Sequence, residues 1–181
     1  MHFFKHLATV TRHRRSVRKN CFKCGLIWKG LTHDLSKFSP QEFWAGAKYF
    51  QGNRSPQAKE RELFGYSPAW LHHKGRNKHH FEYWTDYLNG QKVYVEMPAK
   101  YLAEMICDRI AASKTYLKDK YTNAAPLEYF EKGTDKTGMN PNTCEKLKYF
   151  LTLLKDEGEE ETFKQLKQYV KENKKHPKGG K

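Results

Sequence analysis

A histidine and an aspartate stand side by side at His33 and Asp34, and Lys37 follows three residues after the pair. An imidazole nitrogen and a carboxylate oxygen are both good ligands for divalent transition-metal ions, and the second carboxylate oxygen can reach a second ion. The dipeptide alone is weak evidence, because His-Asp pairs occur by chance in many proteins. Its meaning depends on whether the chain supplies further ligands.

Further ligands do surround the pair, because six of the nine histidines fall between residues 13 and 80. They are His13, His33, His72, His73, His79 and His80, and a later acid, Asp108, adds a carboxylate. Imidazole and carboxylate together suit Mn, Fe, Co, Ni or Zn, and a metal-activated water attacks phosphorus at neutral pH. The set predicts a centre of one or two divalent transition-metal ions. The alternative is a group of unrelated histidines packed in the core.

Apolar spacing predicts that helices carry these residues. Apolar residues between Leu7 and Trp28 recur at three-, four- and seven-residue intervals, which predicts a helix with His13 on or beside its buried face. Ser39-Pro40 reads as an N-cap followed by the first helical position, and Glu42 is interpreted as the capping-box partner of Ser39. Pro98 starts a long helix that carries Asp108. We expect helices over residues 3–28, 40–50, 69–73, 78–88, 98–118 and 126–130, over the segment with Leu147, Phe150, Leu151 and Leu154, and over 159–170.

The expected fold is therefore all-α, a compact single-domain helical bundle without a convincing sheet. Residues 51–66 and 133–141 read as loops, and Trp28, Phe43 and Trp44 are expected to face inward. Residues 1–118 form the predicted metal-binding core, and residues 119–170 add helices that pack on it. Residues 171–181 are lysine-rich and expected to be disordered.

The formal charge of +14 predicts attraction to polyanions and phosphorylated ligands, without separating nucleic acid from nucleotides. No apolar run approaches the length of a membrane span, so no membrane association is expected. The N-terminus lacks the cleavage site of a signal peptide. Four scattered cysteines do not make a disulfide framework, and Cys21 and Cys24 are read as core residues. These features predict a cytoplasmic protein; the oligomeric state is not indicated.

The ordered motifs resemble the HD-domain superfamily of metal-dependent phosphohydrolases. That superfamily has an early helical His, a His-Asp pair and a distant Asp, which correspond here to His13, to His33-Asp34 in His-Asp-Leu-Ser-Lys37, and to Asp108. The segment Asn77-Lys-His-His-Phe-Glu-Tyr-Trp84 is also similar to one in a group of small bacterial and phage HD-like proteins. The resemblance covers about residues 5–118 and implies the HD-domain type of bundle.

The same resemblance implies the ligand sets. His13, His33, Asp34 and Asp108 would hold one metal ion, and His73 and His80 would hold a second, with Asp34 bridging the two. His72 and His79 stay as alternates, because each histidine pair leaves its ligand unsettled. Asp34 and Lys37 are the predicted catalytic residues. The predicted substrate-binding residues are Lys37, Lys74, Arg76, Asn77, Lys78 and Arg109.

The expected activity is metal-dependent hydrolysis of a phosphoester in a nucleotide or another small phosphorylated molecule. Two alternatives remain at this point. The same superfamily contains di-iron oxygenases, so the centre can serve redox chemistry instead. The high positive charge also suits a non-enzymatic helical module that binds nucleic acid or a protein partner.

Overall fold

The structure is a computed structural model that describes residues 1–133 and 135–174. The prediction of an all-α fold is confirmed, because helices make up 73% of the chain and strands 5%. The elements are α1 (Phe3–Lys23), α2 (Ile27–Thr32), η1 (Leu35–Phe38), α3 (Pro40–Lys48), α4 (Pro56–Phe64), α5 (Pro68–Arg76), η2 (Phe81–Tyr83), β1 (Thr85–Leu88), β2 (Gln91–Tyr94), α6 (Ala99–Leu117), η3 (Lys118–Lys120), α7 (Ala125–Lys132), η4 (Asp135–Gly138) and α8 (Pro141–Glu172).

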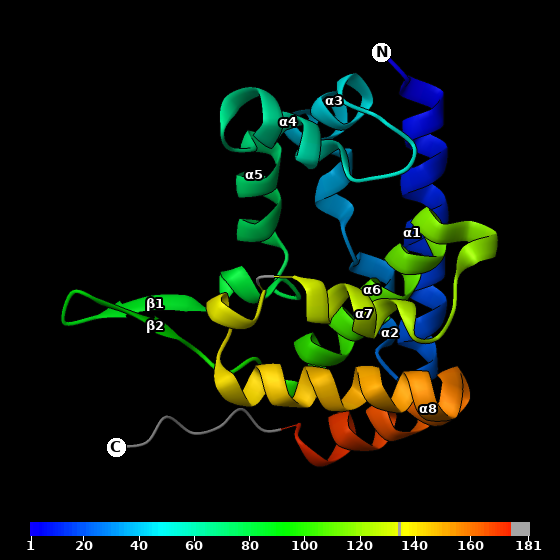
Figure 1. Cartoon of the computed structure of the whole chain (residues 1–181), viewed down its shortest axis with the longest axis vertical. Helices are drawn as coiled ribbons and strands as arrows, with labels where there is room; N and C mark the ends of the chain where they lie inside the picture. The colour runs from blue at the N-terminus through cyan, green and yellow to red at the C-terminus, as the bar shows by residue number, and fades with distance from the viewer. Residues whose placement is uncertain (134, 175–181) are drawn as a thin grey trace.

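The apolar core lies where α1, α6, α7 and α8 meet. Figure 1 shows α8 as a layer along one side of α6 and α7, with α1 crossing their end. Val17 of α1, Ile106 of α6, and Leu151 and Phe163 of α8 belong to one cluster of buried side chains. Each such side chain contributes roughly 1.5–3 kcal/mol when it leaves water. This packing fixes the axis of α6, on which two site residues are carried.

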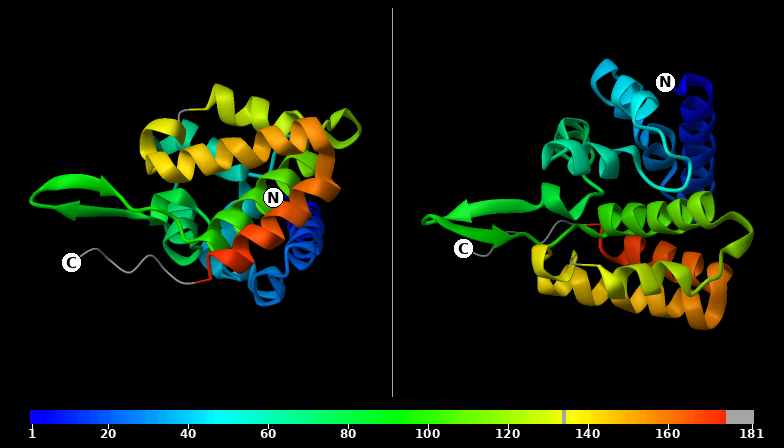
Figure 2. Two further views of the ribbon diagram at one scale, coloured as in Figure 1. Left: turned by 90° about the horizontal axis from the view of Figure 1, so that it is seen from below. Right: turned by 45° about the horizontal axis from the view of Figure 1, so that its top comes forward.

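A second group of helices, α3, α4 and α5, lies on the side of the molecule away from α8, and α3 joins it to α1 (Figure 2). Each of the three begins with the same pattern, a serine followed by proline at the first helical position: Ser39-Pro40, Ser55-Pro56 and Ser67-Pro68. Proline is favoured there because its fixed φ suits the first turn and its missing N–H has no helical partner. The site described below lies between this group and α6.

The prediction of a helix over residues 78–88 is wrong. The chain instead forms the short η2 and then a protruding hairpin in which β1 pairs with β2 in antiparallel register (Figure 1). Asn89 and Gly90 form its turn with φ of 51° and 75°. Two positive φ angles match a type I′ turn, for which Asn-Gly is the preferred sequence. The turn signal therefore outweighs the helical spacing, and the expectation of no sheet is wrong for the same reason.

Other boundaries also differ from expectation. The first helix ends at Lys23 because Gly25 adopts a φ of 74°, and α2 follows as a separate helix. Trp28 is then turned outward and is 79% exposed, while Trp44 is 51% exposed, so neither faces inward as expected. The expected loop over 51–66 contains α4.

The C-terminal helices join into one element. The gap expected between them corresponds to a kink in α8 at Gly158, whose φ is 81°. The tail expected to be disordered begins inside α8 and otherwise lies mostly outside the described residues. Among the residues that the structure describes, no helix is both long enough and apolar enough to cross a membrane.

Candidate metal centre

A single tight turn presents His33 and Asp34 to the interior. α2 ends at Thr32, and η1 begins at Leu35, which leaves only two residues between the helices. Asp34 adopts the left-handed conformation with φ 51° and ψ 31°. Aspartate tolerates this region better than most residues, and such strained positions cluster at functional sites. Both side chains are 1% exposed, so the turn buries an imidazole and a carboxylate together.

The first candidate ligand set joins α1, the turn and α6. Nε2 of His33 lies 3.5 Å from Oδ2 of Asp34 and 3.6 Å from Oδ1 of Asp108. Nε2 of His13 lies 2.9 Å from the same Asp108 oxygen. Ligand atoms at about 2.1 Å from one ion lie roughly 3.0–3.4 Å apart. His13, His33 and Asp34 each offer one ligand atom within 4.8 Å of the other two. Asp108 lies beside both histidines, so the structure brings together the four residues predicted for the first ion.

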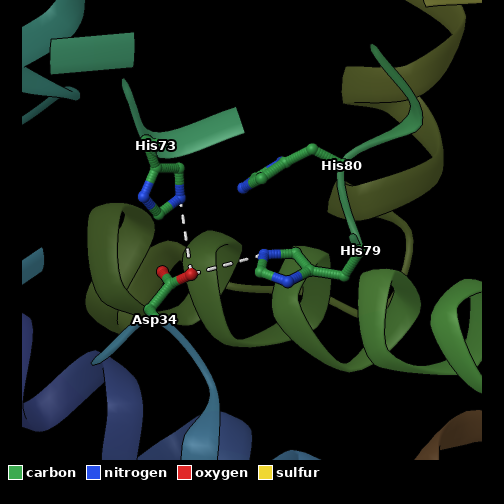
Figure 3. A group of neighbouring side chains, drawn as sticks. All are labelled: Asp34, His73, His79 and His80. Carbon is green, nitrogen blue, oxygen red and sulfur yellow. Dashed lines mark ion pairs between the residues drawn. The ribbon is translucent and has the colours of Figure 1, made fainter. Parts of the chain in front are cut away.

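The second candidate set joins the same aspartate to α5 and to the turn that follows it. Figure 3 shows His73 and His79 on either side of Asp34, with His80 pointing toward the space between them. Nε2 of His73 and Nε2 of His79 each lie 3.4 Å from Oδ1 of Asp34. One ligand atom from each of these four residues lies within 4.8 Å of all the others. The sequence favoured His80 and kept His79 as an alternate, and the structure brings both histidines to the same group.

Several buried ligand atoms of the two sets have no hydrogen-bond partner. They are Nε2 of His33, Nε2 of His79, Nε2 of His80 and Oδ1 of Asp34. An unpartnered buried polar atom costs about 1–3 kcal/mol, more when it is charged, and one such atom needs an explanation. Three such nitrogens around an aspartate whose own oxygen also lacks a partner fit a bound cation, because a cation satisfies nitrogen lone pairs and carboxylate oxygens at once. The donor set therefore fits one or two divalent transition-metal ions.

Two buried glutamates stand behind the histidines. Nδ1 of His73 lies 2.7 Å from Oε2 of Glu42, and Nδ1 of His33 lies 3.1 Å from Oε1 of Glu104. Nδ1 of His72 lies 2.7 Å from Oε1, the other carboxylate oxygen of Glu42. Glu42 is therefore not the capping residue that the sequence suggested, and the Ser39 side chain makes no cap bond.

The charges of the centre suit metal binding. Burial raises the pKa of Asp34, but the charges of His33 and Lys37 outweigh burial and hold that pKa well below its usual range. Burial likewise works against ionisation of Asp108, yet the neighbouring His13 and His33 imidazoles keep its pKa well below normal. Burial lowers the pKa of His13, and it lowers the pKa of His80 well below normal. Both carboxylates are thus charged and both of these imidazoles neutral at pH 7, the forms that bind metals.

A cavity of about 180 Å³ opens beside the centre. Its walls include His13 and Asp108 of the first set, His73 and His80 of the second set, and Lys37. Further wall residues include His6, Val10, Phe50, Trp70, Thr115 and Tyr116. Nζ of Lys37 lies 2.7 Å from Oδ2 of Asp34, and its side chain is 24% exposed. The centre is therefore reached from a cavity rather than sealed in the core.

The other predicted substrate-binding residues do not line this cavity. Asn77 donates to Oγ of Ser36 at 2.8 Å and to the carbonyl of His73 at 2.8 Å, so it braces α5. The Arg109 guanidinium lies 5.9 Å from the centroid of the Phe130 ring. Three basic residues of the α5 region are absent from the cavity walls in the described part of the chain: Lys74, Arg76 and Lys78.

Sequence reasoning missed the roles of Glu42 and Glu104. A signal did exist for Glu104, because it precedes Asp108 by four residues and so shares its helix face. Glu42 gave a misleading signal, since Ser39 and Glu42 have the spacing of a capping box. Only the packing of α5 against α3 shows that its carboxylate meets His72 and His73.

The fold and the site together define a mostly helical protein with two candidate metal-ligand sets that share one aspartate. The chain belongs to the family described as "Family of unknown function (DUF5662)", whose model matches residues 2–153. This span contains every residue of both ligand sets and both glutamates. No curated protein and no solved structure matches the chain.

Proposed function

We propose that the protein is a metal-dependent phosphohydrolase of the HD-domain type that acts on a small phosphorylated substrate such as a nucleotide. The observation that carries the proposal is the position of Asp34, whose carboxylate belongs to two ligand sets beside unpartnered histidine nitrogens. The HD resemblance supports the same reading, because His13, His33-Asp34 and Asp108 occur in the order of that superfamily. The four free cysteines suit a cytoplasmic setting.

When bound, two divalent ions supply Lewis acidity and a water-derived nucleophile at neutral pH. The chain's part is to hold them. The first ion would take His13, His33, Asp34 and Asp108. The second would take Asp34 with His73, His79 and His80. Because Asp34 serves both, it would also fix the separation between the ions.

Lys37 would hold the anionic group of the substrate. It lies on the cavity wall within 2.7 Å of Asp34, so a phosphate oxygen beside the centre comes within its reach. Burial lowers the pKa of Lys37, but the charges of Asp34 and Asp108 outweigh burial and raise that pKa overall. Lys37 therefore keeps its proton at neutral pH and acts as a fixed positive charge, not as a proton donor to the leaving group.

The size of the cavity favours a compact substrate. About 180 Å³ lies below the roughly 300–1,000 Å³ of sites that enclose drug-sized ligands. Aromatic walls from Phe50, Trp70 and Tyr116 suit a planar or apolar group attached to the phosphate. A small phosphomonoester fits this description better than a nucleic-acid strand.

The test is phosphate release from a panel of phosphomonoesters that includes nucleoside monophosphates and p-nitrophenyl phosphate. The purified protein is loaded in turn with Mn, Fe, Co, Ni or Zn, and its metal content is measured alongside. We expect hydrolysis with at least one metal and none after chelation or in Asp34→Asn. A folded protein that binds stoichiometric metal but releases no phosphate from any substrate contradicts the proposal.

A second candidate keeps the centre and changes its chemistry to that of a di-iron oxygenase. The observation in its favour is the nitrogen-rich second set, with three histidines and one carboxylate, since imidazole ligands suit iron. Anaerobic purification with iron analysis and a visible absorption spectrum tests it. A colourless protein that hydrolyses phosphomonoesters with Mn contradicts it.

A third candidate is a nucleic-acid-binding module that uses the outer face of α1. The first 33 residues contain eight Lys or Arg and no Asp or Glu. In the described residues no ion pair with a carboxylate involves Arg12, Arg15 or Lys19, which lie on the exposed side of α1. Phe4, which is 81% exposed, continues that side. An unpaired basic face with aromatic residues suits the phosphates and bases of a single strand.

This third candidate predicts binding that survives chelation and Asp34→Asn. Replacing Arg12, Arg15 and Lys19 by Gln should weaken binding of a labelled oligonucleotide and reduce the salt slope by about two units. A matched variant replaces three lysines of α8 that have acidic partners, Lys148, Lys155 and Lys164. Equal losses in the two triple variants contradict a specific α1 face.

A further inference from the structure

The two glutamates behind the centre contact different numbers of ligand histidines. Glu42 contacts one candidate ligand, His73, through Oε2, and its Oε1 contacts His72, which belongs to neither ligand set. Oε1 of Glu104 lies 3.1 Å from Nδ1 of His33 and 3.4 Å from Nδ1 of His79. The two rings that share this oxygen have centroids 4.4 Å apart. One glutamate therefore stands behind a single ligand set, and the other stands behind both.

The contacts fix which ring nitrogen is available to a metal. A carboxylate only accepts hydrogen bonds, so Nδ1 of each contacted histidine carries the proton and donates it. Nε2 is then the nitrogen that faces the centre and can give its lone pair to a metal ion. This agrees with the unpartnered Nε2 atoms of His33 and His79. Both glutamates are almost fully buried, at 4% exposure for Glu42 and 3% for Glu104.

We infer that Glu42 and Glu104 are positioning residues with unequal reach: Glu42 orients the second ligand set alone, through His73, and Glu104 orients both sets, through His33 and His79. This inference rests on the proposed metal centre. It makes Glu104 the link between the two ions on the side opposite Asp34. The centre is then held from two sides, by one shared ligand and by one shared hydrogen-bond acceptor.

Glu104 is not itself assigned as a ligand, although its oxygen and one nitrogen of each of the two histidines lie within 4.8 Å of one another. An ion there would have to bind the Nδ1 atoms. That would leave both Nε2 atoms, which lie 3.5 Å and 3.4 Å from Asp34 oxygens, without a role. The second oxygen of Glu104 faces Lys29 at 3.4 Å, and a cation beside that ammonium group is unfavourable.

The test compares Glu42→Gln with Glu104→Gln. Glutamine keeps the shape of the side chain and removes its charge. Metal content is measured after equilibration in buffers of fixed free Zn or Mn concentration, which gives the affinity of each site without relying on activity. We expect Glu42→Gln to weaken one site by about 10–100-fold and to leave the other unchanged, and Glu104→Gln to weaken both by that factor.

Glu60→Gln is the matched control. Glu60 is equally buried, at 4% exposure, but its carboxylate meets Ser67 and no histidine of the centre. Both sites should keep their wild-type affinity in this variant. Lys29→Met is the second control, because Glu104→Gln also removes the acidic partner of Lys29. If Lys29→Met weakens both sites as much as Glu104→Gln, the effect belongs to Lys29 and the inference fails.

The outcomes separate the inference from the function on which it rests. A wild-type protein that binds no metal overturns the proposed centre. A wild-type protein that binds two ions, with Glu42→Gln and Glu104→Gln behaving like Glu60→Gln, overturns the inference alone. Equal weakening of both sites by the two variants also overturns it, because the unequal reach would then be absent.

Histidine-selective ¹⁵N NMR of the metal-free protein supplies a readout that does not depend on affinity. In the wild type, His33, His73 and His79 should each show a protonated Nδ1. Glu42→Gln should shift only the His73 signals among the ligand histidines. Glu104→Gln should shift those of His33 and His79. Unchanged signals in folded variants contradict the positioning roles, and circular dichroism establishes that each variant is folded.

Discussion

The two sides of α6 are both buried, but by different means. On one side Leu102 and Ile106 are fully buried in the apolar core that α8 completes. On the other side Glu104 and Asp108 meet the histidines of the candidate centre. The apolar side needs nothing beyond the protein. The acidic side faces buried nitrogen atoms without partners, so its stability depends on what it binds.

Cys107 shows how sharply the two sides are separated. It directly precedes Asp108, yet its side chain is fully buried and its sulfur lies 3.7 Å from Sγ of Cys24. Burial raises the pKa of Cys107 well above its usual range, so it remains a neutral thiol. Cys21 and Cys24 share this core, which confirms the reading of the CxxC motif as packing. One residue along the helix separates a candidate metal ligand from a core thiol.

The largest effect is expected from Asp34→Asn. The variant removes the charge shared by both ligand sets, so both ions should be lost, with more than about 100-fold weaker binding and no phosphate release. Asparagine tolerates the positive φ of this position, whereas alanine would add strain of about 1 kcal/mol. Elemental analysis measures the loss. One ion retained at wild-type affinity would show that Asp34 is not shared.

His73→Ala should cost less than Asp34→Asn, because His73 belongs to one set only. We expect the second ion to be lost and the first to stay. His72→Ala is the matched variant, since His72 contacts the same glutamate but lies outside both ligand sets. It should retain both ions within a few-fold of wild-type affinity. Metal loss from His72→Ala equal to that from His73→Ala would contradict the assignment.

Leu151→Ala tests the apolar side. Leu151 is fully buried, and removing it should lower the free energy of unfolding by about 2–5 kcal/mol. Urea titration of the metal-free protein measures this change. The folded fraction should still bind two ions, because α8 contributes no ligand. Loss of metal in proportion to stability would mean that the two sides of α6 are not independent.

Chelation tests the acidic side without any substitution. At free metal about 100 times the Kd, one ion adds about 2.7 kcal/mol of stability. For a chain of this length that corresponds to a fall in Tm of about 5–10 °C when the ion is removed. Differential scanning calorimetry with and without chelator measures it. An unchanged Tm, with metal shown to have left, would mean that the acidic side is stable alone.

The smallest expected effect is the change of metal affinity with pH. Burial lowers the pKa of His33, but the charge of Asp34 and the neighbouring carboxylates of Asp108 and Glu104 outweigh burial and raise that pKa to about 10. A metal ion must displace that proton, so affinity at the first site should rise about tenfold per pH unit from pH 7 to 9. The metal-free protein should do the opposite. The pKa of His33 in the folded protein exceeds its value near 6.5 in the unfolded chain. The stability that protonated His33 contributes is therefore fully present below pH 6.5 and is lost as the pH rises toward 10.

Isothermal titration calorimetry in buffers of different ionisation enthalpy counts the proton released per ion. Thermal melts of the metal-free protein from pH 6 to pH 10 check the opposite trend. Metal affinity that is flat over this range would show that His33 carries no proton to displace.

The sequence predicted which candidate ligand residues come together better than it predicted their setting. The residue types and the order of the motifs, through their resemblance to the HD-domain superfamily, singled out His13, the His33-Asp34 pair and Asp108, and the structure places them side by side. The hairpin after His80 was missed, since the Asn-Gly turn competed with an equally plausible helical spacing. Glu42 was misread for a different reason: its histidine partners lie on α5, and no local pattern reveals a contact made only by packing.

The most direct test of the shared centre is anomalous diffraction from crystals of the protein loaded with Zn or Mn. Data collected on both sides of the metal absorption edge locate each ion without reference to activity. We predict two peaks on either side of the Asp34 carboxylate, one beside His13, His33 and Asp108 and the other beside His73, His79 and His80. A single peak, no peak, or a peak between Glu104 and the Nδ1 atoms of His33 and His79 would contradict the account.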